Sequence, residues 1–408
     1  MPKNIVFCAD RTWNDPGESD SDDPRRPWTN VFKLFLNLAG VDDPATTQLE
    51  KEQERTLTAA DGTVEQVAKY LHGVGDSMNL LAKLIGGGFG VGLITRIVRG
   101  YTFISRNYQT SDKIYLVGFS RGAYTVRALA GLISAKGLLS ASDAGTNDDK
   151  GPGYRLGAAV WYQWRHEVLR TQAHSIDHFE QIVLDLPGFL RRSPAPAPMV
   201  HAPIEAVAVW DTVGALGIPR FDGQHVAVDL FEFADTALTA NVRFGRHAIS
   251  IDERREEFTP TLWNPDGNRI VQVLFPGAHA DVGGGYPLTG NESGLSDGAL
   301  LWIGRELKTL GVRFVTLPRV VPTPDPTGVA HQPWNEPLWR GLPRGTRVLP
   351  AGLGLSKSVI DRIQAGSVKP DPATAAAAYT PINLAQYING LGPSPAVQVI
   401  NASNQDWP

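Results

Sequence analysis

Residues 113–134 read KIYLVGFSRGAYTVRALAGLIS, and this stretch decides the fold class. It begins with a continuous apolar run, which predicts a buried strand, and its apolar residues from Ala123 to Ser134 recur at helical spacing. Between them lies Gly118-Phe119-Ser120-Arg121-Gly122, a G-x-S-x-G motif in the strand-turn-helix context that gives this motif its meaning. So sharp a turn needs Gly118 and Gly122, because side chains there would clash with the adjacent strand and helix. The stretch therefore predicts Ser120 as a nucleophile at a helix N-terminus.

Three further runs have the composition of buried strands, and they extend from Asn4 to Ala9, from Glu205 to Trp210 and from Ile270 to Phe275. Each run is continuously apolar rather than alternating, as expected of strands that are covered on both faces. Strands that alternate with helix-like stretches predict an α/β protein, in which a mostly parallel central sheet carries helices on both faces. In such sheets the ligand site lies outside the carboxyl ends of the strands.

A serine hydroxyl needs a base to accept its proton, and His279 is the best candidate among the nine histidines. It follows the run that ends at Phe275 and opens the stretch HADVGGGY, whose glycines permit a loop wrapped closely around a site. It also comes last in the chain order of serine, acid and histidine. We expect Gly283 to support the site, and His72 and His247 are weaker candidates for the base.

The base in turn needs a carboxylate to hold its tautomer and to stabilise its charged form. Asp211 directly follows the run that ends at Trp210, a position that predicts the edge of the site. Asp281 is the main rival, although its place two residues after His279 also suits a tether for the glycine stretch. Asp252 is expected in a structural ion pair.

An oxyanion site requires two backbone N–H donors in folds of this kind. The first is expected from Arg121, the residue after the nucleophile, and the second from Arg11 or Thr12 at the end of the first strand. Asp10 either orients that loop or forms an Asx turn without a catalytic part.

The composition is that of an ordinary globular enzyme, with 408 residues and a net charge of -4. The acidic balance and the lack of long basic runs argue against a nucleic-acid partner. The single cysteine, Cys8, excludes a disulfide within the chain and a cysteine metal cluster, and we expect neither metal nor cofactor. The N-terminus enters the first strand without the apolar stretch of a signal peptide, which predicts synthesis in the cytoplasm without a cleaved signal.

We expect one catalytic domain over residues 1–320 and a Pro/Gly-rich C-terminal extension, residues 321–408, packed on the same domain. A helical insertion at about residues 140–203 interrupts the catalytic domain. It is either a cap over the site or a peripheral helical layer, because both have this pattern. Nothing after about Val320 indicates chemistry.

The sequence resembles a family of bacterial and fungal α/β-hydrolases that includes the type VI secretion lipase effectors of the first class. The resemblance covers nearly the whole chain, and the residues that carry it are Phe7–Asn14, Thr29–Val31, Gly73–Gly75, Gly118–Arg127, Trp210–Gly214, His247–Arg255, Phe275–Tyr286, Ser356–Arg362 and Tyr379–Leu384. The resemblance implies an α/β-hydrolase fold and phospholipase or related ester hydrolysis, with Ser120, Asp211 and His279 at the triad positions. It further implies peripheral contact with a membrane, a secretion-machine or immunity protein as partner, and delivery by type VI secretion to the periplasm of a rival cell.

One residue departs from the family pattern, because Arg11 stands where the family usually has glycine. A long side chain there reshapes the oxyanion site, crowds it, or adds a cation for an anionic substrate. Three functions are consistent with the sequence. The leading one is a phospholipase, and the alternatives are a cytoplasmic esterase for small soluble acyl esters and a hydrolase-like binding protein with a closed oxyanion site.

Overall fold

The computed structural model describes residues 2–11, 27–47, 52–73, 89–145, 150–171, 199–213, 237–337, 339–391, 397–401 and 407. Thr12 and most of the second half of the expected helical insertion lie outside these residues.

The strands of the described residues form one ten-stranded sheet in the order β10-β9-β8-β7-β6-β5-β1-β4-β3-β2. Neighbours from β4 to β10 pair in parallel, whereas β3 and β2 are added antiparallel at one edge. The predicted α/β class with a mostly parallel sheet is therefore confirmed. The strands are β1 (Asn4–Ala9), β2 (Val41–Asp42), β3 (Glu52–Thr58), β4 (Val64–Leu71), β5 (Lys113–Phe119), β6 (Ile204–Trp210), β7 (Val242–Ser250), β8 (Ile270–Phe275), β9 (Gly354–Ser356) and β10 (Val399–Ile400).

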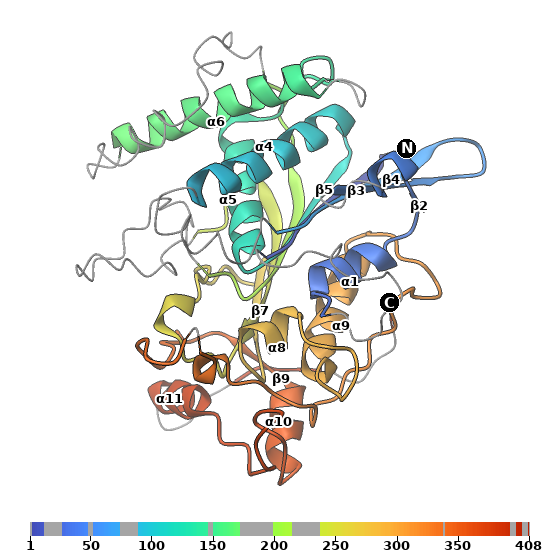
Figure 1. Cartoon of the computed structure of the whole chain (residues 1–408). Coiled ribbons are helices and arrows are strands. Elements are labelled where there is room, and N and C mark those ends of the chain that lie inside the picture. Colours follow the sequence, from blue (N-terminus) through green and yellow to red (C-terminus); the bar gives the residue numbers. More distant parts are fainter. Residues whose placement is uncertain are drawn as a thin grey trace.

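Helices cover both faces of the sheet, because side chains of the buried strands alternate between two apolar cores. On β1, Ile5 and Phe7 belong to one core, while Val6 and Cys8 belong to the other. Figure 1 shows α4, α5 and α6 on one side of the strands and α1 and α9 on the other. These helices are α1 (Asn30–Asn37), α4 (Phe89–Asn107), α5 (Arg121–Lys136), α6 (Gly151–Thr171) and α9 (Gly294–Thr309).

Helix α6 is the described helical part of the insertion expected at residues 140–203. It packs against α4 and α5, and its buried Trp161 belongs to the same apolar core as these helices. For α6 this placement favours a peripheral helical layer, and a cap formed by the rest of the segment stays a prediction.

The C-terminal segment adds strands β9 and β10 to the sheet and closes a third apolar core. Helices α10 (Lys357–Gln364) and α11 (Ile382–Gly390) supply Val359, Leu384 and Tyr387 to this core. Residues after 320 therefore share the central sheet with residues before it. The short elements α2 (Pro44–Thr47), α8 (His279–Gly283), η3 (Glu256–Phe258) and η4 (Pro333–Asn335) lie in the connections.

Candidate active site

Ser120 occupies the sharp turn between β5 and α5, with φ 57° and ψ -124°. This strained conformation is rare for a residue with a side chain and is held by its surroundings. The Ser120 N–H donates to the Trp210 carbonyl at 3.1 Å. A Cβ on Gly118 would lie 2.5 Å from the Gly122 oxygen, and one on Gly122 would lie 2.0 Å from the Ala9 oxygen. Both glycines are therefore required by close backbone approach, as the motif predicts.

Asp211 and His279 are in direct contact at the carboxyl edge of the sheet. Asp211 follows β6, the strand that pairs with β5 through Trp210 and Phe119. His279 begins α8 after β8, and its Nδ1 lies 2.6 Å from Asp211 Oδ2. The His279 ring packs against Phe119, the neighbour of Ser120, with ring centroids 4.6 Å apart. The structure thus brings the predicted acid and the predicted base together beside the turn of Ser120.

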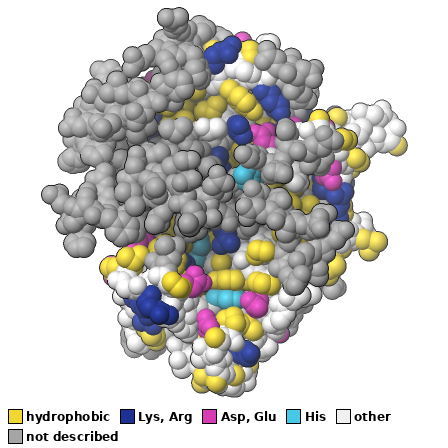
Figure 2. All heavy atoms as spheres, viewed as in Figure 1, with side chains coloured by type: hydrophobic (Ala, Val, Ile, Leu, Met, Phe, Trp, Pro, Cys, Tyr) yellow, Lys and Arg dark blue, Asp and Glu magenta, His cyan; other side chains and the backbone are white. Residues whose placement is uncertain are grey.

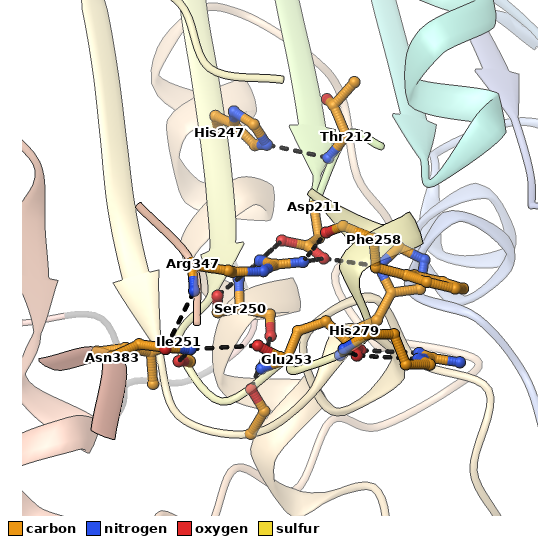
Figure 3. A network of polar contacts seen from close by, with 12 residues as sticks. Asp211, Thr212, His247, Ser250, Ile251, Glu253, Phe258, His279, Arg347 and Asn383 are labelled. Carbon is orange, nitrogen blue, oxygen red and sulfur yellow. Dashed lines mark hydrogen bonds and ion pairs between the residues drawn. The ribbon is translucent and has the colours of Figure 1, made fainter. Parts of the chain in front are cut away.

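The Asp211 carboxylate is fully buried and surrounded by donors. Figure 3 shows it between Arg347 and His279, while Ser250 N–H donates to its Oδ1 at 2.9 Å. Burial alone would raise the pKa of Asp211, but Arg347 and His279 outweigh that effect and hold the pKa far below its usual range. Asp211 is therefore ionised at neutral pH and accepts a hydrogen bond from the protonated Nδ1 of His279.

His279 is buried and neutral at pH 7. Burial lowers its pKa, and the contact with Asp211 opposes that effect only in part. The ring also lies against Phe258, with centroids 4.8 Å apart. The backbone N–H of His279 donates to Glu253 Oε2 at 3.2 Å. Its Nε2 atom is buried and has no hydrogen-bond partner among the described residues. An imidazole with Nδ1 protonated and Nε2 unoccupied has the form required of a general base.

The rival acid Asp281 serves another histidine. Its Oδ1 lies 2.7 Å from His331 Nδ1, and its Oδ2 accepts the N–H groups of Ala278 and His331 at 2.9 Å and 3.0 Å. Asp281 thereby caps α8. The stretch that begins at His279 is expected to start as a loop because of its glycines, but residues His279–Gly283 form this short helix instead. The cap forms because an acid in the first turn satisfies helix N–H groups.

His247 and Asp252 both take structural positions. His247 is fully buried in β7 and its Nε2 accepts the Thr212 N–H at 3.1 Å, and burial lowers its pKa to about 3. Asp252 accepts the Gly277 N–H and the Tyr379 hydroxyl, each at 2.7 Å. The ion pair expected for Asp252 is therefore wrong for the described residues, and burial raises its pKa to about 6. His72, also a weaker candidate for the base, directly follows β4.

The expected oxyanion donors lie at the start of α5 and at the end of β1. Arg121 is the first residue of α5, so its N–H belongs to the helix N-terminus beside Ser120. The Arg11 N–H instead donates to Asp10 Oδ1 at 2.6 Å, while Asp10 Oδ2 accepts the hydroxyls of Thr29 and Tyr70. Asp10 thus anchors the end of β1 to Thr29 and Tyr70, and the Arg11 amide is occupied.

The Arg11 side chain lies over the site rather than away from it. Its guanidinium carbon is 5.8 Å from the centre of the Phe119 ring, and a Cβ on Gly285 would lie 2.4 Å from its Nη2. Burial lowers the pKa of the Arg11 guanidinium. It also lowers the pKa of Arg96 to about 10 and the pKa of Arg121 to about 9. Arg121 follows Ser120 directly and the Arg11 side chain lies against Phe119, so two arginines lie next to the turn of Ser120.

Two negative findings concern the described part of the chain. No three His, Cys, Asp or Glu side chains there are grouped as ligands for a metal ion. None of the described helices combines the length and apolar character needed to cross a membrane.

Sequence reasoning missed Arg347 and His331, which contact Asp211 and Asp281 from the C-terminal segment. Arg347 lies in the irregular stretch LPRGTRVLP, which has neither periodicity nor a motif. No local signal marks these residues, because their partners are far away in the sequence.

Comparisons with known proteins add family information. A family model described as the catalytic domain of type VI secretion, Tle1-like phospholipase effectors matches residues 3–306. The uncharacterized protein YEL023C of Saccharomyces cerevisiae is 26% identical over 263 residues, which cover 64% of this chain and 33% of that protein.

Two solved structures are also similar, each with 16% sequence identity. An uncharacterized protein from Pseudomonas aeruginosa has a TM-score of 0.38 and is matched over 77% of this chain and 46% of its own. The Tle1 effector bound to the VgrG spike of the type 6 secretion system has a TM-score of 0.36, with 70% and 51% covered. The chain thus spans only about a third to a half of the length of these relatives.

Proposed function

Because the chain belongs to the family of type VI secretion phospholipase effectors with a Tle1-like catalytic domain, we propose that it is a serine hydrolase that cleaves the carboxylic ester bonds of phospholipids. The observation that carries the proposal is the His279–Asp211 pair, with 2.6 Å between Nδ1 and Oδ2, beside the strained turn of Ser120. A buried acid and a neutral histidine at a nucleophile elbow match the requirements for activating a serine.

The proposed reaction proceeds in two acyl-transfer steps. Ser120 Oγ attacks the ester carbonyl carbon while its proton passes to His279 Nε2, and Asp211 stabilises the resulting imidazolium. The Arg121 N–H contributes to the oxyanion site. Since the Arg11 N–H already donates to Asp10, the second donor is proposed to be the Thr12 N–H, a residue that lies outside the described ranges. The alcohol leaves with the proton from His279, and a water molecule activated by the same base then releases the acyl group from Ser120.

The surroundings support an amphipathic, anionic ester as substrate. Arg11 and Arg121 add positive charge beside the nucleophile, which suits the phosphate of a phospholipid. On the face seen in Figure 2, histidine, acidic and basic side chains lie among hydrophobic ones in the lower half of the view. Such a mixed surface can contact both the polar and the apolar part of a lipid.

Delivery and partners follow from the family as part of the same proposal. We propose that the chain, alone or as part of a larger protein, is loaded onto a type VI secretion spike and reaches the periplasm of a target cell. An immunity protein in the producing cell would then protect its own membrane. Binding of the purified chain to a spike protein of the same cell, measured by co-purification, tests this part separately.

The activity is tested with vesicles of phosphatidylethanolamine and phosphatidylglycerol, beside a short-chain soluble ester. Release of fatty acid from the vesicles by the unaltered protein, and loss of that release in Ser120→Ala, supports a phospholipase. Turnover of the soluble ester alone makes the protein an esterase. If neither substrate is hydrolysed, the hydrolase proposal fails and a hydrolase-like binding protein takes its place.

A further inference from the structure

Arg347 makes an ion pair with the acid of the proposed triad. Its Nη1 donates to Asp211 Oδ1 at 2.6 Å and its Nη2 donates to Asp211 Oδ2 at 2.8 Å. The same guanidinium donates to the carbonyls of Ser250 and Phe258, each at 2.7 Å. A two-point contact of this kind holds a carboxylate in one plane and one orientation.

The ion pair also changes the charge that His279 experiences. Asp211 Oδ2 accepts from both Arg347 Nη2 and His279 Nδ1, so a permanent cation and the base share one oxygen. An acid alone would favour the imidazolium, whereas a cation bound to that acid cancels part of the effect. Arg347 is 6% exposed and Asp211 is 0% exposed, so solvent screens the pair weakly.

The other charged groups near His279 are paired with one another. Glu253, which accepts the His279 N–H, is held by two bonds from the Arg255 side chain at 2.9 Å and 2.7 Å. On α8, Asp281 is bound by His331 Nδ1. Replacing Arg347 therefore changes the charge beside Asp211, while the Glu253–Arg255 and Asp281–His331 pairs stay in place.

Resting on the proposed hydrolase function, we propose that Arg347 is a positioning residue that orients Asp211 and offsets its charge, so that His279 remains a neutral base in mildly acidic surroundings. Arg347 does not touch the reacting atoms and acts through Asp211. Its backbone N–H donates to Asn383 Oδ1 at 3.1 Å, and the Asn383 amide donates to the Ile251 carbonyl at 2.6 Å. The C-terminal segment lies beyond residues 3–306 of the family match. It supplies Arg347, which binds and orients the Asp211 carboxylate.

The first test is the pH profile of kcat/KM on a soluble ester for Arg347→Gln and Arg347→Lys. The glutamine variant loses the cation, so its acid limb should move upward by about one pH unit or more. The lysine variant keeps the charge but not the two-point contact, so its limb should stay near that of the unaltered protein while kcat falls. Arg340→Gln removes an exposed cation whose described partner is the Asn335 carbonyl, and it should change neither quantity.

A second readout does not depend on activity. The midpoint of the His279 ring titration, followed by NMR and assigned with His279→Gln, should rise in Arg347→Gln and stay in place in Arg340→Gln. An unchanged midpoint in a folded Arg347→Gln protein would overturn the inference. If Arg347→Gln does not fold, Arg347→Lys provides the test. A rise in the midpoint of its His279 titration, or an unaltered kcat, would then overturn the inference. Loss of the proposed function looks different, because the unaltered protein would then hydrolyse no ester while the titration shift persisted.

Discussion

Replacing Gly283 by alanine should disturb the packing of α8 against Phe119, the residue before Ser120. A Cβ at this position would lie 2.0 Å from Cε2 of Phe119 and 2.2 Å from Cζ, so the new methyl group overlaps the edge of the ring. The ring is fully buried and packs against His279, with centroids 4.6 Å apart. It can therefore move only by displacing the proposed base or the chain around it.

The cost of such overpacking in a close-packed core is about 1–3 kcal/mol of unfolding free energy. Urea denaturation measures this cost, and the matched control is Gly298→Ala in α9, where a Cβ would have nothing within 4 Å. Alanine is favoured over glycine in a helix interior, so the control should gain roughly 0.5–1 kcal/mol.

The reasoning is refuted if Gly283→Ala leaves the urea midpoint and slope unchanged. It also requires coupling with Phe119, because Phe119→Ala removes all the ring atoms that the new methyl group overlaps. In that background the cost of Gly283→Ala should shrink by about 1 kcal/mol or more. Equal costs in both backgrounds would show that the ring is not the obstacle.

Two further predictions concern pH and buried charge. Since burial lowers the pKa of His279 below its ordinary value of 6.5, the acid limb of kcat/KM of the unaltered protein should be centred below pH 6.5, with activity present above that pH and lost as the pH drops through the lowered pKa. An acid limb centred above pH 6.5 would contradict this. Lys33→Met should cost about 3–5 kcal/mol in urea denaturation, because it leaves the buried Asp297, now 2.8 Å from Lys33 Nζ, without its cation. Lys136→Met, which removes the partner of the exposed Glu167, should cost less than about 1 kcal/mol, and equal losses in the two variants would argue against the buried pair.

The parts of the fold that could be predicted are those with a local signal. The strands β1, β5, β6 and β8 are continuous apolar runs, and the turn at Ser120 has its glycines at fixed positions. Even there the boundaries differ, because β5 continues through Gly118 to Phe119 before the turn begins. The chain order and the strand ends were sufficient to select Asp211 and His279, which prove to be in contact.

Other strands could not be predicted, because distant partners satisfy their polar residues. Strand β7 contains Arg246, which binds Glu306 of α9, and His247, which accepts the Thr212 N–H. In β4 the fully buried Lys69 is compensated by Glu52 and Glu54 on the neighbouring strand. A sequence pattern scores such residues as exposed and polar, whereas the tertiary structure gives them buried partners.

The arginine that binds the proposed catalytic acid escaped prediction for a related reason. Arg347 lies 136 residues from Asp211 in the chain, in a stretch with no regular secondary structure. The C-terminal segment that contains Arg347 adds β9 and β10 to the sheet beside β8, and Asn383 binds the Arg347 N–H. Its role depends on topology, which local pattern does not contain.

The central claim is that Ser120 is a nucleophile activated by His279, and covalent labelling with a fluorophosphonate tests it most directly. The serine oxygen displaces fluoride at phosphorus, so peptide mass spectrometry identifies the modified residue. We expect one label on Ser120, none in Ser120→Ala, and labelling slowed by about 10²–10⁴-fold in His279→Asn. An unlabelled folded protein, or a label that survives Ser120→Ala at another residue, would contradict the account.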